Sequence, residues 1–312
     1  TQVAAGYTAP AVTGDVRLGS GNDTFSIADG TVTGNVTFGG GNDTLALSGD
    51  AVQAGKVTFG AGTDAMSLAG TSTFTGTVDF GGGADSLTLA DTAVFSGALA
   101  NSGGLAVKVS GGTFGVNKPA SIASLDVGAK GVLAVTLNKA AGEGTALNVA
   151  GNASFAEGAK LSLRLADVTT AEGNYTVLTA GSLTGRDKLE TSTDLVPFMF
   201  KATLDEDAPA NVIVVDVARR TVQELGLNRS QSSAYNAIFA ALAKDDDIEK
   251  VFLGDTNGDA FREHVSQMLP DHAGGAFEGI SMGVRTLTRQ LQDPQGPTFG
   301  DARLVTLSLI HI

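Results

Sequence analysis

The sequence contains no cysteine and no tryptophan, and only 7 of its 312 residues are proline. Without cysteine there is no disulfide framework, no thiolate metal site and no cysteine nucleophile. Charged residues make up 17% of the chain and aromatic residues 6%. Instead there are 42 glycines and 42% hydrophobic residues, enough apolar surface for a substantial core. This composition is typical of a repetitive β protein.

Basic residues are also scarce, since 20 lysines and arginines stand against 33 acidic residues and give a net charge of −13. The chain has no basic stripe that would displace counterions, so nucleic acid is not a predicted partner. No apolar run approaches the roughly 18–20 residues of a transmembrane helix. The chain starts with threonine and shows no signal peptide, so we expect its N-terminus to lie inside a longer protein.

A glycine recurs every 20 or 21 residues in the first third of the chain, and the residues after it keep one frame. A valine follows it, then leucine or phenylalanine, then paired glycines, an aspartate and two apolar positions that alternate with small polar residues. The recurring residues are Gly14, Gly34, Gly55, Gly76 and a weaker Gly97; Val16, Val36, Val57 and Val78; Leu18, Phe38, Phe59 and Phe80; and Asp23, Asp43, Asp64 and Asp85.

A repeat of this length cannot bury its apolar edge alone, but stacked copies bury it by placing like residues above like. The valine and the leucine–phenylalanine positions would then form the interior of a parallel β-helix. The predicted fold class is mainly β, a right-handed parallel β-helix (solenoid) followed by a small α-helical region.

Stacking also places the four aspartates in a row, about 4.8 Å apart. Ionised neighbours at that distance repel by roughly 0.9 kcal/mol in water and by about 3–4 kcal/mol at an effective dielectric near 20. Two explanations are open. Either the carboxylates point into solvent and cap their own turns, or a cation lies between them.

The second explanation is supported by a resemblance. The stretches GSGNDTFS (residues 19–26) and GGGNDTLA (residues 39–46) resemble the calcium-binding nonapeptides of repeats-in-toxin proteins, Gly-Gly-x-Gly-x-Asp-x-apolar-x. The first glycine of that pattern is replaced, and each coil carries one nonapeptide where that family has two. The resemblance implies calcium as a cofactor, with the metal-site residues Asp23, Asp43, Asp64 and Asp85.

From about Ala120 the 21-residue period fades while strand patterns persist as far as NVIVVDVAR, residues 211–219. We expect less regular coils there and a terminal cap that protects the open end of the solenoid.

Helical patterns follow these coils. Asn228 or Ser230 suits a helix N-cap, and the acidic run at 245–247 suits the start of the next helix. Later apolar stripes are formed by Phe261, Val265, Met268 and Leu269, and by Phe277, Ile280, Val284, Leu287 and Leu291.

Four stretches in this second half, LDVGAKGVLAVTL, GNYTVLTAGSLTG, AYNAIFAALAKDDDIEKVF and FREHVSQMLPDHAGGAFEGIS, resemble the region just upstream of the β-barrel in bacterial autotransporters, the type V secretion proteins. The resemblance covers roughly residues 120–294. It implies a passenger β-helix at the outer membrane or cell surface, or in the extracellular space, of a Gram-negative bacterium. The implied partners are an outer-membrane β-barrel of the same polypeptide and a host or surface ligand.

The predicted organisation has four parts: residues 1–118 form regular coils, 119–217 irregular coils and the cap, 218–293 an α-helical junction before a missing barrel, and 294–312 a truncated end. Nothing after Pro294 resembles amphipathic barrel strands of about 9–11 residues. Residues 307–312, LSLIHI, match a translation of CTG-TCT-CTT-ATA-CAC-ATC, the mosaic-end adapter of transposase-based sequencing libraries. We therefore expect the natural protein to continue.

Two patterns hint at chemistry and are better explained structurally. GISMG around Ser281, with His264, Asp271 and His272 nearby in sequence, lacks the strand that a nucleophile elbow needs. GDTNGDAFRE (residues 254–263) departs from the spacing of an EF-hand, so Asn257 or Asp259 is a predicted helix cap. A polysaccharide-acting β-helix enzyme remains an alternative, but the first coils offer only Arg17 and Lys56 as basic partners. No enzyme is predicted.

Overall fold

The computed structural model describes residues 9–137, 146–168, 171–189 and 196–269. The chain divides into two units, residues 1–266 and 267–312, and the fold described here is that of the first. The strands of the regular coils are β1 (Ala11–Thr13), β2 (Val16–Arg17), β3 (Thr24–Ile27), β4 (Thr31–Thr33), β5 (Val36–Thr37), β6 (Thr44–Leu47), β7 (Val52–Thr58), β8 (Ala65–Leu68), β9 (Thr73–Asp79), β10 (Ser86–Leu89) and β11 (Val94–Ala100).

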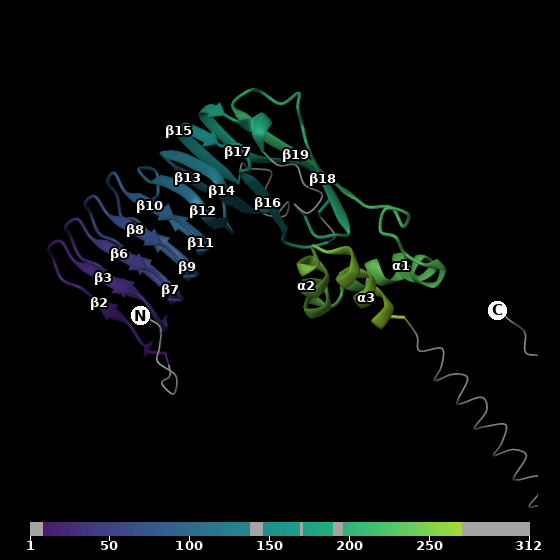
Figure 1. The fold of residues 1–312 in the computed structure, drawn as a ribbon, viewed down its shortest axis with the longest axis horizontal. Helices are drawn as coiled ribbons and strands as arrows, with labels where there is room; N and C mark the ends of the chain where they lie inside the picture. Colours follow the sequence, from purple (N-terminus) through teal and green to yellow (C-terminus); the bar gives the residue numbers. More distant parts are fainter. Residues whose placement is uncertain (1–8, 138–145, 169–170, 190–195, 270–312) are drawn as a thin grey trace, which may run out of the picture. The chain divides into compact units, whose positions relative to one another are not determined.

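These strands stack in parallel, coil on coil, as Figure 1 shows. One ladder runs through β1, β4, β7, β9 and β11, a second through β2, β5, β7, β9 and β11, and a third through β3, β6, β8 and β10. The register aligns Val16 with Val36, Val36 with Val57 and Val57 with Val78. The predicted β-solenoid is therefore confirmed, with about six turns, while its right-handedness stays a prediction.

The interior of the regular coils is built from the predicted ladders. Val36, Val57 and Val78 are fully buried. The ring of Phe59 lies between those of Phe38 and Phe80, with centroid separations of 4.8 and 5.4 Å. Identical apolar residues thus pack on one another along the solenoid and exclude water continuously.

The recurring glycine has a steric reason, which Gly55 illustrates. Its φ is +140°, a region that other L residues rarely adopt. A Cβ on Gly55 would lie 2.2 Å from the carbonyl oxygen of Gly34 in the preceding coil. Only glycine fits where the stacked backbones bend this closely together.

The later coils are irregular in length, as the loss of the 21-residue period predicts, and Ala106 pairs with Ser124 only 18 residues later. Ser154 hydrogen-bonds to Asp126, 28 residues earlier, and Thr179 to Asn148, 31 residues earlier. Their strands are β12 (Ala106–Val116), β13 (Ala120–Ile122), β14 (Ser124–Leu137), β15 (Leu147–Phe155), β16 (Lys160–Leu165), β17 (Gly173–Thr184), β18 (Phe200–Leu204) and β19 (Val212–Arg219), with a 3-10 helix η2 at Arg186–Lys188.

The strand predicted at residues 211–219 is β19, and it changes the direction of pairing. β19 is antiparallel to both β17 and β18, whereas the strands before it pair in parallel. This antiparallel group occupies the end of the parallel stack, where the sequence predicts a cap. The antiparallel pairing itself was not predicted.

Three helices follow: α1 (Arg229–Leu242), α2 (Asp246–Gly254) and α3 (Gly258–Gln267). Asn228 caps α1 in a reciprocal capping box with Gln231, and Asp245 caps α2. Asn257 Oδ1 accepts the amide of Asp259, which confirms the predicted cap of α3.

None of the helices in the described ranges is long and apolar enough to cross a membrane. The stripe from Phe277 to Leu291, Ser281 and residues 294–312 lie outside those ranges.

Candidate functional site

The four recurring aspartates form one continuous hydrogen-bonded row, which we call the Asp ladder (Asp23, Asp43, Asp64 and Asp85). The backbone amide of Asp23 donates to Oδ1 of Asp43 at 2.8 Å. The amide of Asp43 donates to Oδ1 of Asp64 at 2.8 Å, and that of Asp64 to Oδ1 of Asp85 at 2.9 Å. Each of the last three carboxylates therefore binds the backbone of the coil before it, not its own turn.

The Asp ladder lies inside the solenoid. Asp43 and Asp64 are each 1% exposed and Asp85 2%. Side chains two residues apart on a strand share a face, so the frame Asp-x-Leu-x-Leu places Asp43 on the same inward face as Leu45 and Leu47. The expectation that these carboxylates point into solvent and cap their own turns is wrong. The period-2 alternation, applied to the aspartate itself, would have indicated the buried position.

One oxygen of every ladder carboxyl has no partner. Oδ2 of Asp23, Asp43, Asp64 and Asp85 is buried and makes no hydrogen bond. Burial raises the pKa of Asp64, the amide of Asp43 opposes the rise, and the carboxylates of Asp85 and Asp43 add to it. In Asp43, Asp64 and Asp85, therefore, one carboxyl oxygen accepts a hydrogen bond and the other does not.

A second row follows the same turns on the outside. Oδ1 of Asn22 accepts the amide of Asn42 at 2.8 Å, and Oδ1 of Asn42 accepts the amide of Thr63 at 2.8 Å. Both asparagines are exposed. The repeated Asn-Asp pair thus joins consecutive coils twice, once at the surface through asparagine and once in the interior through aspartate.

The calcium hypothesis stays a prediction. Within the described ranges, no group of three or more histidine, aspartate or glutamate side chains is placed to hold a metal ion. The ladder carboxyls follow one another along the stack and do not converge on a single point. The unpartnered Oδ2 atoms are nevertheless the oxygens that a cation or a proton would satisfy.

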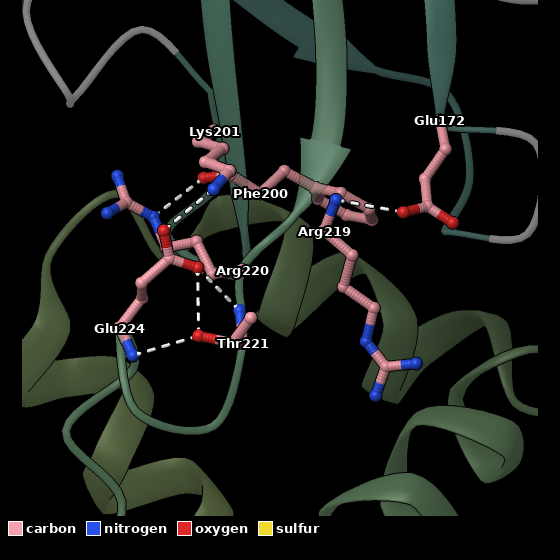
Figure 2. Close-up of polar contacts among 7 residues, drawn as sticks. All are labelled: Glu172, Phe200, Lys201, Arg219, Arg220, Thr221 and Glu224. Atoms are coloured by element: carbon pink, nitrogen blue, oxygen red, sulfur yellow. Dashed lines mark hydrogen bonds and ion pairs between the residues drawn. The ribbon is translucent and has the colours of Figure 1, made fainter.

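The second polar cluster lies where β18 and β19 lead into the helices (Figure 2). The amide of Arg219 donates to Glu172 at 2.9 Å, and Nε of Arg220 donates to the carbonyl oxygen of Phe200 at 2.9 Å. Oε1 of Glu224 pairs with Nζ of Lys201 at 2.7 Å, and its Oε2 accepts the amide of Thr221 at 2.7 Å. The chain is thus held in a defined turn as it leaves the sheet.

The side chain of Arg219 connects the sheet to helix α1. Its guanidinium lies 3.7 Å from the ring centroid of Phe239 and 4.6 Å from that of Tyr235, and it donates to Asn236 at 3.0 Å. Burial raises the pKa of the Tyr235 hydroxyl, and the nearby positive charge of Arg219 opposes that rise. Cation–π contact and packing therefore fix α1 against β19. No pattern in the sequence indicates this contact, because it depends on how β19 and α1 meet in the fold.

The residues weighed for catalysis do not assemble into a reactive site in the described part of the chain. His264 Nδ1 lies 2.8 Å from Oδ2 of the buried Asp255, which joins α3 to the end of α2. Arg17 pairs with Asp15 and Lys56 with Asp79, both at the surface. Ser281, Asp271 and His272 lie outside the described ranges.

Comparisons with models of known protein families, with curated proteins and with solved structures gave no match.

Proposed function

We propose that this chain is a fragment of a bacterial autotransporter: a surface-exposed or secreted passenger stalk together with its junction to a translocating barrel. Its role is structural or adhesive and not catalytic. The sequence resemblance over residues 120–294 motivates the proposal. A β-solenoid is consistent with a stalk, because each coil repeats the same contacts and the length of such a scaffold is set by the number of coils.

The observation that supports the proposal best is the way the parallel stack ends. β19 closes it with antiparallel pairs, and the chain then enters α1 through the turn at Arg219 and Thr221. Oε1 of Glu249 on α2 accepts the amide of Val168 at 2.8 Å, so a second helix is bonded to the same end of the coils. Cap and helices are thus bonded to each other at one end of the coils, which suits a junction between a stalk and a barrel.

The first experiment is a long sequencing read across the source locus, starting from the codons for residues 277–294. The proposal expects an open frame that continues into roughly 250–300 residues of alternating amphipathic strands. A stop codon directly after Ile312 would remove the secretion argument and leave a free β-solenoid.

The recovered gene also permits a test of location with cysteines introduced into the coils, because residues 1–312 contain no cysteine. A cysteine introduced as Thr63→Cys lies at an exposed turn, whereas Leu45→Cys lies in the core. In intact Gram-negative cells that express the gene, a membrane-impermeant maleimide should label the first variant and not the second. Labelling of Thr63→Cys only after lysis would contradict surface display.

A further inference from the structure

The Asp ladder contains buried carboxyl oxygens without hydrogen-bond partners, and the proposed role as a stalk does not explain them. Oδ1 of Asp43, Asp64 and Asp85 accepts a backbone amide, but every Oδ2 in the row is buried without a partner. An ionised carboxylate at Asp64 keeps its charge away from water with one oxygen unsatisfied, which disfavours the charged form. Protonation removes the charge and turns one carboxyl oxygen into a donor.

No positive charge compensates the ladder in the part of the chain that the structure describes. The strands that follow its four rungs, β3, β6, β8 and β10, have the sequences TFSI, TLAL, AMSL and SLTL and carry no charged side chain. The charged groups that act on Asp64 are the carboxylates of Asp43 and Asp85, and both have the same sign.

The remaining charged side chains of these coils are engaged at the surface. On the neighbouring strands β7 and β9, Lys56 pairs with Asp79 at 3.4 Å, and at β2 Arg17 pairs with Asp15 at 3.7 Å. In the loops, Asp91 accepts the amide of Gly70, and Asp29 lies against Asp50 in an exposed carboxyl pair. None of these groups neutralises the Asp ladder.

We propose that the Asp ladder is a proton-binding site, in which Asp64 is protonated in the folded solenoid at a pH where an exposed aspartate is ionised. The coils are then held together more firmly in mildly acidic than in alkaline solution. Asparagine accepts the same kind of amide, as Asn22 and Asn42 show, but it has no charge to lose or gain. Aspartate therefore makes the cohesion of the coils respond to pH. The inference depends on the ladder geometry and stands whether or not the chain is an autotransporter stalk.

The direction of the response follows from linkage. Because burial raises the pKa of Asp64 above its usual 3.8, the folded state binds more protons than the unfolded state above that pH. Stability then falls as the pH rises from 3.8 through the folded-state pKa. Each unit of difference between the two pKa values corresponds to about a tenfold change in the folding equilibrium constant.

The test uses the chain of residues 1–312, with urea unfolding followed by circular dichroism between about pH 4.5 and about pH 8.5. The wild-type midpoint should fall as the pH rises. Asp64→Asn and the triple variant Asp43→Asn/Asp64→Asn/Asp85→Asn should have a higher midpoint near pH 8 and a flatter pH profile. Asp79→Asn is the matched control, because Asp79 lies near the surface and the Asn101 and Lys56 side chains lower its pKa. This control should keep the wild-type slope.

Two results would overturn the proposal. Asp64→Asn with the wild-type slope would show that the ladder takes up no proton. A midpoint at pH 8 that calcium chloride raises and EDTA restores, in the wild type but not in the triple variant, would show that a metal ion and not a proton satisfies the ladder.

A second measurement keeps the proposal falsifiable if the asparagine variants do not fold. An infrared spectrum of the folded chain with its ladder aspartates intact, recorded near pH 6, should show a protonated carboxyl band that unfolding removes. Asp29, in the exposed pair with Asp50, also contributes to this band, because its hydrogen bond with the Asp50 side chain raises the pKa of Asp29. The spectrum is therefore recorded in an Asp50→Asn background. A spectrum without the protonated band would reject the proton-binding site.

Discussion

The rings of Phe38 and Phe59 stack with their centroids 4.8 Å apart and their planes 10° from parallel. This separation equals the spacing between neighbouring strands, so each coil presents its phenylalanine directly to the next. Phe59 is 2% exposed and also stacks on Phe80. The phenylalanine ladder therefore couples the stability of each coil to that of both neighbours.

Phe59→Ala should be strongly destabilising, because it removes a ring that contacts the coils on both sides and leaves a cavity. We expect a loss of about 3–5 kcal/mol in the free energy of unfolding. Urea denaturation of the variant and the wild type measures the difference. Val12→Ala at the exposed first strand is the control, with an expected change within about 0.5 kcal/mol. Equal effects of the two substitutions would contradict the stacked core.

Gly55→Ala should disrupt the stack locally, since the new Cβ would collide with the carbonyl oxygen of Gly34 and the residue would keep a positive φ. Strain of this kind costs about 1–3 kcal/mol before the collision is counted. Gly40→Ala is the matched control, because a Cβ there meets nothing within 4 Å. Thermal unfolding should separate the two variants clearly. A Gly55→Ala variant as stable as Gly40→Ala would mean that the coils are further apart at this bend.

Asn228→Ala should loosen the start of helix α1. Oδ1 of Asn228 accepts the amide of Gln231, and the Gln231 side chain accepts the amide of Asn228 in return, both at 2.9 Å. Loss of such a cap costs roughly 0.5–2 kcal/mol. Amide hydrogen exchange in the first turn of α1 should accelerate, whereas Ser230→Ala, two residues later at the exposed helix start, should leave it unchanged. Unchanged exchange in Asn228→Ala would show that the cap is not formed in solution.

Glu224 should titrate far below an ordinary glutamate. Its hydrogen bonds with Lys201 and then with the amide and hydroxyl of Thr221 lower its pKa from 4.5 to about 2. A lowered folded-state pKa stabilises the turn fully above pH 4.5, and this contribution is lost as the pH falls through about 2.

Carbon-13 NMR of the Glu224 carboxyl measures this pKa directly. Because the group lies at the surface, solvent screening keeps its effect on global stability small. Lys201→Met should move the titration upward, and a wild-type value near 4.5 would contradict the contact. The pH response of this junction is opposite in sign to that of the Asp ladder, so the two regions are distinguishable in one titration.

Much of the solenoid could be predicted because its contacts repeat along the chain. Val36, Val57 and Val78 lie one period apart, and stacking brings residues one period apart into contact by construction. The caps at Asn228, Asp245 and Asn257 could be predicted for a related reason, since each acts on amides within three residues. Local and periodic contacts are both visible in a single sequence.

The state of the candidate site could not be predicted in the same way. The sequence placed the four aspartates in a row, and its alternation held the information that they face inward. Whether their Oδ2 atoms find hydrogen-bond partners depends on which other groups pack beside them in the interior. A local sequence pattern does not contain that information. Only the structure shows that these Oδ2 atoms are buried without hydrogen-bond partners.

The sequence by itself determined the repeat, the parallel stacking and the identity of the core ladders, because these follow from period and polarity. Only the tertiary structure decided how the stack ends. The antiparallel pairing of β19 and the contact of Arg219 with Phe239 join segments whose separation follows no period. Such contacts form because the apolar end of the last coil must be covered, and the shape of that end exists only once the coils have folded.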